Sequence, residues 1–409
     1  MKIVHISTTE RTGGAAIAAN RLHKAMLRNS IDSQMLVLRR NSNSSLVKVA
    51  CNSRWQRING EYIKPIKASR VKYNRNQLGQ FSSFDFGTDI STDDVVRGAD
   101  VIYLHWVNDG FQSFDTICKI LELGKPTYWL MHDMFPITGG CNYSFGCEEY
   151  TRNCSGCKYF DMKLTSGASK QFARKARLKE YKNLHWIAPS KWLYDCASKS
   201  GLVDVDRLYH LPLIISPAFQ PMDASVAREL LGLPQDKKII LAGADNILGV
   251  PYKGWNEFRE AIQSVYKRVD NARDMEVVLF GAEYIKEGAD SIPFKSTFLG
   301  QMSDEYSMNL IYNAADFLVA STMMDNYPQT IAESLCSGTP VVGFKTGGIV
   351  DMIEATGNGV LCEQGNTEEL AEGILKMLET SNEPNLSYLK EFANEVELIN
   401  QHKALWDEN

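Results

Sequence analysis

The sequence lacks the features of membrane-spanning, exported and disordered chains. It contains no run of about 18 apolar residues, the length that a membrane helix requires. Its N-terminus, MKIVHISTTERTGGAA, has no apolar segment of the kind found in signal peptides. Internal repeats and low-complexity tracts are also absent. We therefore expect a cytoplasmic protein that is neither exported by a standard signal nor inserted in a membrane.

Two common nucleotide-binding patterns are missing from the glycine-rich loop near the N-terminus. The loop at Gly13-Gly14 has neither the G-x-G-x-x-G order of a dinucleotide site nor the G-x-x-x-x-G-K-[ST] order of a P-loop. This absence disfavours chemistry with NAD or ATP.

The composition is that of an ordinary globular protein, but its charges are unevenly distributed. The 409 residues are 44% hydrophobic and 23% charged, which fits two domains or one large one. Residues 1–215 carry 30 basic and 19 acidic side chains, a balance of +11, whereas residues 216–409 carry 14 and 30, a balance of −16. The asymmetry suggests two domains with different partners, one of them anionic.

Short β-prone runs alternate with helix-patterned stretches along the chain. The first is a strand at residues 2–7, followed by the Gly13-Gly14 turn and a helix at 15–27. Later runs lie at 34–38, 101–104, 127–131 and 185–188, and a second series lies at 238–243, 276–281, 296–299, 316–320 and 340–344. This alternation predicts an α/β fold with parallel, helix-covered sheets.

Three prolines between residues 211 and 221 separate the two series. We predict a Rossmann-like N-terminal domain at 1–215, a Rossmann-like C-terminal domain at 216–386 and a terminal helix at 387–409. Apolar residues at Leu389, Phe392, Val396 and Leu398 suggest that this helix packs on the N-terminal domain or bridges both domains. Ligands bind outside the carboxyl ends of such strands, so we expect an active site in a cleft between the domains.

The most informative segment runs from Asp325 to Val342. It predicts a loop after the strand at 316–320, a helix beginning near Thr330, a stop at Gly338 and another buried strand. Backbone N–H groups at a helix N-terminus can bind an anion, and Glu333, one turn further, can accept hydrogen bonds from ribose hydroxyls. Without further information, Asp325 and Glu333 are explained equally well as solvated side chains, one on a loop and one on a helix.

This segment resembles the E-x7-E region of the retaining, nucleotide-sugar-dependent glycosyltransferases of family 4, which have the GT-B fold. The match comprises the acidic-Asn-aromatic-Pro-x-Thr-x-x-Glu order, the helix ending in Gly-Thr-Pro-Val-Val and the Thr346-Gly347-Gly348 turn with Asp351. The resemblance extends over nearly the whole chain. It implies two Rossmann-like domains facing across a cleft, with the acceptor in the N-terminal and the donor in the C-terminal domain.

The resemblance also implies a set of donor-binding residues. Glu333 is expected to bind the ribose, and Lys253 to neutralise the departing diphosphate. The sugar and the diphosphate are expected to contact Asp325 and the segment after it, which comprises Asn326, Tyr327, Pro328, Gln329 and Thr330. The diphosphate is also expected to face Gly13 and Gly14. Taken alone, a loop lysine is usually just solvated, and a Gly-Gly pair is usually just a turn. The chain departs from the family in having Asp325 where glutamate is usual, and in having no arginine just after Gly243.

His132 and Asp133 follow the strand expected at 127–131. A histidine at the carboxyl end of a strand is often structural, but the resemblance implies that His132 contacts the transferred sugar near the reaction centre. The D-x-D string at residues 204–206 binds a metal in the other major glycosyltransferase fold. Here it lies in a short polar connection, and we interpret it as chance.

Four of the nine cysteines fall within 17 residues, at Cys141, Cys147, Cys154 and Cys157. The odd total, the lack of a signal peptide and the C-x-x-C pair argue against a secreted disulfide framework. We hypothesise a structural zinc site that folds a polar loop. Free buried thiols, or a redox pair at Cys154 and Cys157, are the alternatives.

Two stretches carry most of the basic surplus, one at residues 54–75 with interleaved aromatic residues and one at residues 170–182. The second comprises Lys170, Arg174, Lys175, Arg177, Lys179 and Lys182. A solvated helix face is the commoner explanation of such a run. Our hypothesis is transient contact with an anionic membrane surface, and we expect no nucleic acid partner.

We therefore predict a hexosyl- or related glycosyltransferase that acts in surface-polysaccharide assembly, in the cytoplasm or at the inner face of the membrane. It would transfer a sugar from a UDP- or GDP-sugar to a glycan or lipid-linked glycan, with retention at the anomeric carbon. His132, Asp325 and Lys253 would act at the reaction centre, and catalysis would require no cofactor. The alternatives are a non-hydrolysing sugar-nucleotide epimerase and a catalytically inactive glycosyltransferase-like subunit.

Overall fold

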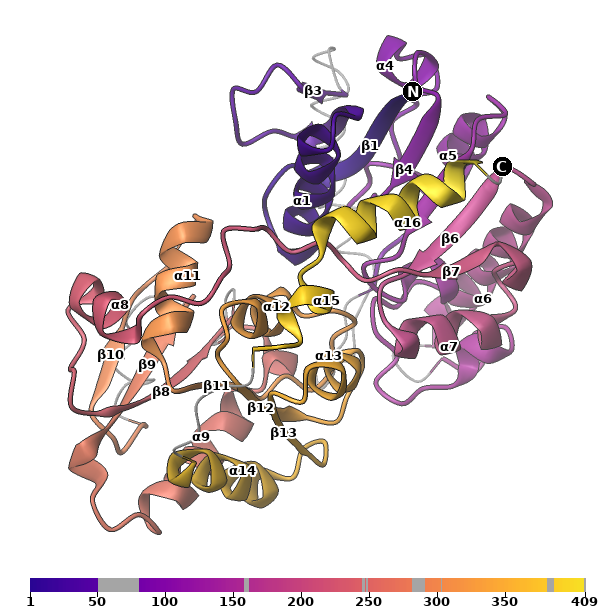
Figure 1. The fold of residues 1–409 in the computed structure, drawn as a ribbon. Helices are drawn as coiled ribbons and strands as arrows, with labels where there is room; N and C mark the ends of the chain where they lie inside the picture. Colours follow the sequence, from indigo (N-terminus) through magenta and orange to yellow (C-terminus); the bar gives the residue numbers. More distant parts are fainter. Residues whose placement is uncertain are drawn as a thin grey trace. The chain divides into compact units, whose positions relative to one another are not determined.

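The computed structural model describes residues 1–50, 81–157, 162–244, 247, 249–281, 291–302, 304–380 and 386–407. The chain divides into two compact units, each built on a parallel sheet (Figure 1). We call Met1–Ile214 with Val396–Asn409 the N-terminal domain, and Ile215–Glu395 the C-terminal domain. Among the helices of the described residues, none is long and apolar enough to cross a membrane.

The N-terminal domain contains a seven-stranded sheet of order β3-β2-β1-β4-β5-β6-β7. Its strands are β1 Lys2–Thr9, β2 Asp32–Arg39, β3 Val47–Val49, β4 Val101–Leu104, β5 Thr127–Leu130, β6 Leu184–Ala188 and β7 Leu208–His210. Its helices are α1 Gly14–Arg28, α4 Asp94–Arg97, α5 Phe114–Leu121, α6 Met162–Ala176, α7 Lys191–Ser200 and α16 Glu395–Asp407. Strands β4, β5 and β6 are buried at every position, as in a parallel sheet covered on both faces.

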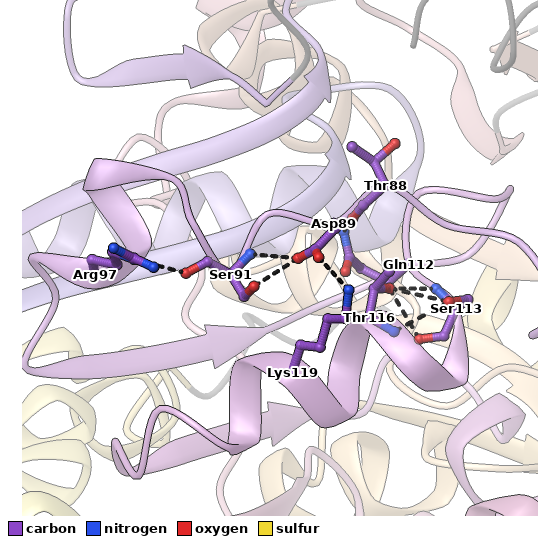
Figure 2. A network of polar contacts seen from close by, with 8 residues as sticks. All are labelled: Thr88, Asp89, Ser91, Arg97, Gln112, Ser113, Thr116 and Lys119. Atoms are coloured by element: carbon purple, nitrogen blue, oxygen red, sulfur yellow. Dashed lines mark hydrogen bonds and ion pairs between the residues drawn. The ribbon is translucent and has the colours of Figure 1, made fainter.

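A polar network anchors α5 at its N-terminus (Figure 2). Ser113 Oγ accepts a hydrogen bond from Thr116 N at 3.2 Å, and Thr116 Oγ1 accepts one from Ser113 N at 2.8 Å, which makes a capping box. Further along the helix, Lys119 Nζ donates to Asp89 Oδ2 at 2.6 Å. These contacts fix α5 against the chain that precedes it.

The C-terminal domain contains a six-stranded parallel sheet of order β10-β9-β8-β11-β12-β13. Its strands are β8 Lys238–Gly243, β9 Met275–Phe280, β10 Ser296–Phe298, β11 Phe317–Ala320, β12 Val341–Phe344 and β13 Gly359–Cys362. Its helices are α8 Ala224–Leu231, α9 Trp255–Tyr266, α11 Glu305–Ala314, α12 Gln329–Cys336, α13 Ile349–Thr356, α14 Thr367–Glu379 and α15 Leu389–Phe392. In both sheets the strand order reverses once, between β1 and β4 and between β8 and β11, which is the doubly wound Rossmann pattern.

The predicted α/β class with two parallel sheets is confirmed, and the strands that the sequence missed lie at sheet edges. Strands β3 and β7 are the two edges of the first sheet, and β13 is an edge of the second. Each is only three or four residues long. Such short strands depend on pairing with a neighbour, and their local sequence carries little hydrophobic pattern.

The prediction of one terminal helix over residues 387–409 is wrong in its extent, whereas its predicted packing on the N-terminal domain is confirmed for α16. The segment forms α15 and α16, and Val396, expected to be buried, is 57% exposed. The buried residues of α16 are Ile399, His402, Leu405 and Trp406. Trp406 Nε1 donates to Tyr103 Oη at 2.9 Å, so α16 is held by β4 of the N-terminal domain.

Candidate functional site

A pocket in the C-terminal domain lies where its strand order reverses. Gly243 ends β8 and Ala320 ends β11, and both line the pocket. Ligands of doubly wound sheets bind at this reversal, outside the carboxyl ends of the strands. The other lining residues are Ala244, Ile247, Lys253, Val319, Ser321, Thr322, Asp325, Pro328, Thr330 and Ile331. The structure therefore brings Lys253 and Asp325 together with Pro328 and Thr330 of the sequence-predicted set.

Lys253 and Asp325 form an ion pair in this pocket. Lys253 Nζ lies 3.0 Å from Asp325 Oδ2, and the two side chains are only 21% and 13% exposed. Charges that are partly withdrawn from water interact more strongly than a surface pair does. The carboxylate therefore holds the ammonium in place beside the ends of β8 and β11.

Two glycines allow the neighbouring loops to close on this pair. Gly254 follows Lys253 with φ +79°, and a Cβ there would lie 1.8 Å from the carbonyl oxygen of Ser321. Gly347 has φ +54°, and its Cβ would lie 1.8 Å from the carbonyl oxygen of Asp325. Both positions exclude any side chain, because the backbone conformation and the space each require glycine.

Glu333 is buried in α12 and has a partner that sequence reasoning missed. Its carboxylate oxygen Oε2 accepts a hydrogen bond from Tyr312 Oη of α11 at 2.7 Å. No local pattern marks Tyr312, because it lies 21 residues before Glu333 and in a different helix. The hydroxyl orients the carboxylate that is predicted to bind ribose.

The remaining residues of the predicted donor loop surround the start of α12. Asn326 and Tyr327 are buried, and burial raises the pKa of the Tyr327 hydroxyl above its ordinary value. Gln329 is the first residue of α12, and Pro328 before it provides no side-chain cap for the first N–H groups. The helix begins within one residue of the predicted start at Thr330.

In the N-terminal domain, Gly13 and Gly14 open α1 as the sequence predicts. Gly13 is the N-cap, with φ +86° and ψ 158°, and Gly14 is the first helical residue. A Cβ on Gly13 would meet nothing within 4 Å, so the backbone angle alone favours glycine there.

His132 follows β5, and the residue as a whole is half-buried. Its Nε2 lies 3.0 Å from Nδ1 of His105, which follows β4, and the two rings stack at 5.3 Å. Burial lowers the pKa of His132 to about 3, so its imidazole is neutral at physiological pH.

Asp133 is a buried structural carboxylate. Its Oδ2 accepts hydrogen bonds from Trp106 Nε1 at 3.1 Å and Asn142 Nδ2 at 2.6 Å, and its Oδ1 accepts one from Phe135 N at 2.9 Å. Burial raises the pKa of this carboxyl to about 6, against the effect of these hydrogen bonds. The contacts fix the chain directly after His132.

The four clustered cysteines line a common pocket with Thr138, Gly139, Ser144, Glu149, Tyr150 and Ala168. Among the described residues none of the four forms a disulfide, and Cys154 Sγ accepts a hydrogen bond from Gly139 N at 3.2 Å. Burial raises the pKa of Cys141 to about 12 and that of Cys154 to about 11. Over the described ranges, no three His, Cys, Asp or Glu side chains are arranged to hold a metal ion. The zinc site stays a prediction.

The second basic stretch is not one continuous basic surface. Lys175 is buried and donates to the carbonyl oxygens of Phe135 and Thr138. Arg174 pairs with Asp85 at 2.9 Å and with Asp115 at 3.4 Å. The exposed members are Lys170, Arg177 and Lys182. The first stretch, residues 54–75, lies outside the described residues.

The D-x-D string has a structural role. Asp204 caps a short 3-10 turn by accepting a hydrogen bond from Asp206 N, and its Oδ2 lies 2.8 Å from Arg207 Nη2. Its carboxylate is therefore engaged within its own turn.

Comparison with solved structures identifies the fold. The chain is similar to Anabaena HepE in complex with UDP and glucose, at a TM-score of 0.63 and 14% identity over 100% of both chains. It is also similar to WaaG, a glycosyltransferase involved in lipopolysaccharide biosynthesis, at a TM-score of 0.61 and 12% identity over 98% of both chains. The fold is that of the GT-B glycosyltransferases.

Sequence comparison narrows the class. Residues 236–380 match the model of the family described as glycosyl transferases group 1. A related protein of Escherichia coli K12, named as a colanic acid biosynthesis glycosyl transferase, WcaC, is 22% identical over 304 residues, covering 71% of this chain and 70% of the relative. Residues 236–380 are thus similar to group 1 glycosyl transferases, and the chain as a whole has the GT-B fold.

Proposed function

We propose that the protein transfers a sugar from a UDP- or GDP-sugar to a glycan or lipid-linked glycan, with retention at the anomeric carbon, in polysaccharide biosynthesis. The observation that carries the proposal is the Lys253–Asp325 pair in the pocket at the reversal of the C-terminal sheet. The similarity to HepE, which binds UDP-glucose, supports the donor, and the name of WcaC supports the setting.

The described side chains have distinct roles in this reaction. The Lys253 ammonium stabilises the diphosphate as the anomeric C–O bond breaks and charge develops on the leaving oxygen. Asp325 orients Lys253 and accepts hydrogen bonds from the sugar, while Glu333, oriented by Tyr312, binds the ribose. The acceptor oxygen bonds to the anomeric carbon on the same face, and its proton passes to the departing phosphate. His132, which stays neutral, contacts the sugar.

The first test is a panel of UDP-, GDP-, ADP- and dTDP-sugars in thermal-shift and turnover assays. A donor present at about 100 times its dissociation constant should stabilise the protein by about 2.7 kcal/mol. Transfer or donor hydrolysis by the wild type supports the proposal. Epimerisation of the donor without an acceptor would indicate an epimerase, and binding without any turnover would indicate an inactive subunit.

Lys253→Met provides the residue-level test. The change removes the ammonium but keeps an unbranched chain, and we expect kcat/KM to fall about 100-fold or more. Lys345→Met is the matched control, because Lys345 also forms an ion pair in this domain, with Glu363 at 2.6 Å, but is 46% exposed. If both Lys253→Met and Lys345→Met retain the wild-type kcat/KM, the assigned role of Lys253 is wrong.

We also propose transient attachment to the inner face of an anionic membrane, where a lipid-linked acceptor would lie. Support comes from the +11 balance of residues 1–215 and from exposed Lys170, Arg177 and Lys182. Sedimentation with anionic liposomes should show binding at low salt that weakens as salt screens the charges. Absence of binding at both low and moderate salt rejects the attachment but leaves the transferase reaction untouched.

A further inference from the structure

Buried polar atoms without a hydrogen-bond partner mark two loops of the N-terminal domain. Among the described residues, six buried side-chain atoms make no hydrogen bond. Three of them belong to strands: Gln34 Oε1, His185 Nδ1 and Glu276 Oε2. The other three lie in the loops after β1 and β4: Glu10 Oε1, Asn108 Nδ2 and Gln112 Oε1. These two loops flank the reversal of strand order in the first sheet, where doubly wound sheets bind ligands.

The pairing of β1 with β4 brings Glu10 and Asn108 together. The pairing continues past the end of β4, where Thr8 N donates to the Trp106 carbonyl oxygen at 2.9 Å. Two residues further along each chain, the same register sets Glu10 opposite Asn108. The Thr8 hydroxyl also donates to the Asn108 carbonyl oxygen at 2.8 Å, which ties the second loop to the end of β1. Glu10 and Asn108 are therefore neighbours at the carboxyl edge of the sheet.

The Glu10 carboxylate is held by one oxygen, and its other oxygen is unmatched. Its Oε2 accepts hydrogen bonds from Asn41 N at 2.8 Å and Ser42 N at 2.9 Å, and its side chain is only 1% exposed. Burial acts against ionisation, but hydrogen bonds from Ser42 and Asn41 lower the pKa of Glu10, so the carboxylate is charged. Arg11 Nε lies 3.6 Å from Oε1, too far for a hydrogen bond. The described residues thus supply no hydrogen-bond donor to Oε1.

Asn108 supplies the complementary atom. The residue is 3% exposed, and its Nδ2 finds no acceptor in the described part of the chain. Buried donors and acceptors in native proteins generally meet a partner, if not in the protein then in a water, an ion or a ligand. A hydroxyl satisfies both atoms, because it donates to Glu10 and accepts from Asn108. A carboxylate cannot donate and is repelled by Glu10, and an ammonium cannot accept.

We propose that Glu10 and Asn108 form a binding site for a hydroxyl of an uncharged glycosyl group. Glu10 accepts a hydrogen bond from the hydroxyl, and Asn108 donates one to the hydroxyl oxygen. The side chain of Arg11, which is 50% exposed and lies beside Glu10 Oε1, moves aside when the ligand enters. The assignment of this ligand as the acceptor of transfer rests on the proposed function, whereas the binding of a hydroxyl does not.

Binding of simple glycosides tests the site without any donor. The probes are the methyl glycosides of glucose, galactose and mannose and those of the matching uronic acids, followed by saturation-transfer nuclear magnetic resonance. We expect at least one neutral glycoside to bind, and its uronate to bind about 10-fold or more weakly, because Glu10 repels the carboxylate. Failure of every neutral glycoside to bind, or equal binding of the uronate, overturns the proposal.

Asn108→Leu and Gln34→Leu form a matched pair of variants. Each replaces an amide side chain that has a buried, unpartnered atom in the N-terminal domain, but Gln34 lies within β2. Asn108→Leu should weaken glycoside binding about fivefold or more through the loss of one hydrogen bond, whereas Gln34→Leu should leave it unchanged. The urea midpoint of Asn108→Leu without ligand should not fall below that of the wild type, because the change removes an unpartnered donor. A lower midpoint with unchanged binding would show a merely structural amide and overturn the proposal.

Glu10→Gln tests the charge of the site. The amide oxygen can still accept from the N–H groups of Asn41 and Ser42, but the charged acceptor becomes an uncharged donor. The preference for neutral glycosides over uronates should shrink about 10-fold. Glu276→Gln is the control, because Glu276 is equally buried but lies in β9 of the C-terminal domain, and it should keep the wild-type preference. An unchanged preference in Glu10→Gln contradicts the role of Glu10.

Transfer kinetics separates this site from the proposed function. With a donor that turns over, Asn108→Leu should raise the KM for the acceptor about fivefold or more and leave the KM for the donor near wild type. An unchanged KM for the acceptor contradicts the assignment of the ligand as the acceptor, while the transferase reaction stands. Binding of glycosides that depends on Asn108, without turnover of any donor, contradicts the proposed function and supports the site.

Discussion

Gly347 shows how a single residue without a side chain can shape the site. It combines a left-handed backbone, φ +54°, with the 1.8 Å approach of its missing Cβ to the Asp325 carbonyl oxygen. The next residue, Gly348, donates its N–H to the same oxygen at 3.1 Å. The loop after β12 thus determines where Asp325 lies.

We predict that Gly347→Ala displaces Asp325 and lowers kcat/KM more than 10-fold. Gly357→Ala is its control, because Gly357 has a similar φ of +61° but nothing within 4 Å of its Cβ position. The control should cost about 1–2 kcal/mol of stability from the left-handed backbone and leave activity near wild type. Steady-state kinetics measures kcat/KM, and urea unfolding measures stability. Equal losses of kcat/KM in the two variants would show that backbone strain alone explains the effect, and would contradict the role of Gly347 in placing Asp325.

At the scale of elements, α16 is held to the N-terminal domain by polar contacts as well as by packing. Trp406 and His402 both contact the Tyr103 hydroxyl, at 2.9 and 3.0 Å, and Tyr128 Oη donates to the Leu405 carbonyl oxygen at 2.6 Å. Both tyrosines lie on neighbouring central strands, β4 and β5. The helix therefore belongs to the core of the N-terminal domain, although the other residues of that domain, Met1–Ile214, lie far earlier in the chain.

Trp406→Ala should destabilise the N-terminal domain by about 3 kcal/mol or more, because the side chain is only 8% exposed. Trp406→Phe keeps most of the ring but removes the N–H, and should cost about 1 kcal/mol. Val396→Ala, at a 57% exposed position of the same helix, should change stability by less than about 0.5 kcal/mol. Hydrogen exchange during urea unfolding reports each domain separately. Similar behaviour of all three variants would contradict the docking of α16.

The loop of four cysteines is the second element with a testable role. If it binds zinc, protein produced with zinc available should hold about one equivalent after mild chelation, and fewer than ~0.2 equivalents would reject the site. Binding should also order the loop and increase its protection from hydrogen exchange. Cys154→Ser should abolish retention, whereas Cys118→Ser, in α5 outside the cluster, should not.

At the scale of the whole molecule, the histidines are confined to one domain. The sequence of Ile215–Glu395 contains none, and all seven lie in the N-terminal domain. Burial is the main cause that lowers the pKa values of six of them: to about 3 for His132, about 4 for His23, His185 and His402, and well below the ordinary value for His5 and His105. These rings are neutral when folded and take up protons below about pH 6.5 when unfolded.

The N-terminal domain should therefore lose stability as the pH falls below 6.5, before the C-terminal domain does. Each such histidine contributes up to about 1.4 kcal/mol per pH unit in this range, until its folded pKa is reached. Asp133 opposes this loss of stability. Because burial raises its folded pKa to about 6, the folded carboxyl takes up a proton at a higher pH than the unfolded one does, which stabilises the folded state as the pH falls. We expect a loss on the order of 5 kcal/mol for the N-terminal domain between pH 7.5 and 5.5, a large share of an ordinary domain's stability.

Urea unfolding followed by hydrogen exchange at pH 7.5, 6.5 and 5.5 measures this loss in each domain. The midpoint of the N-terminal domain should fall steeply and that of the C-terminal domain only slightly. Parallel shifts of both midpoints would contradict the assignment of acid sensitivity to the buried histidines.

Elements with a strong local pattern were predictable from the sequence, and those without one were not. The run at 238–243 matches β8 over its whole length, and the helix predicted at 15–27 differs from α1 by one residue at each end. The three-residue edge strands β3 and β7 were missed, and the buried face of α16 was wrongly predicted. An apolar spacing identifies a helix but does not say which of its faces will meet a partner.

Taken by itself, the sequence determined the parallel α/β class, the two sheets and the glycine-opened first helix, because local pattern carries that information. The order of its motif predicts Lys253, Asp325 and Glu333 as donor-site residues, by resemblance. Only the tertiary structure decided which side chains meet. Lys253 and Asp325 are 72 residues apart, His5 and His105 are 100 apart, and Tyr103 and His402 are 299 apart. Such pairs form because parallel strands bring their carboxyl ends to one edge and a distant helix docks on them, an arrangement that no local spacing encodes.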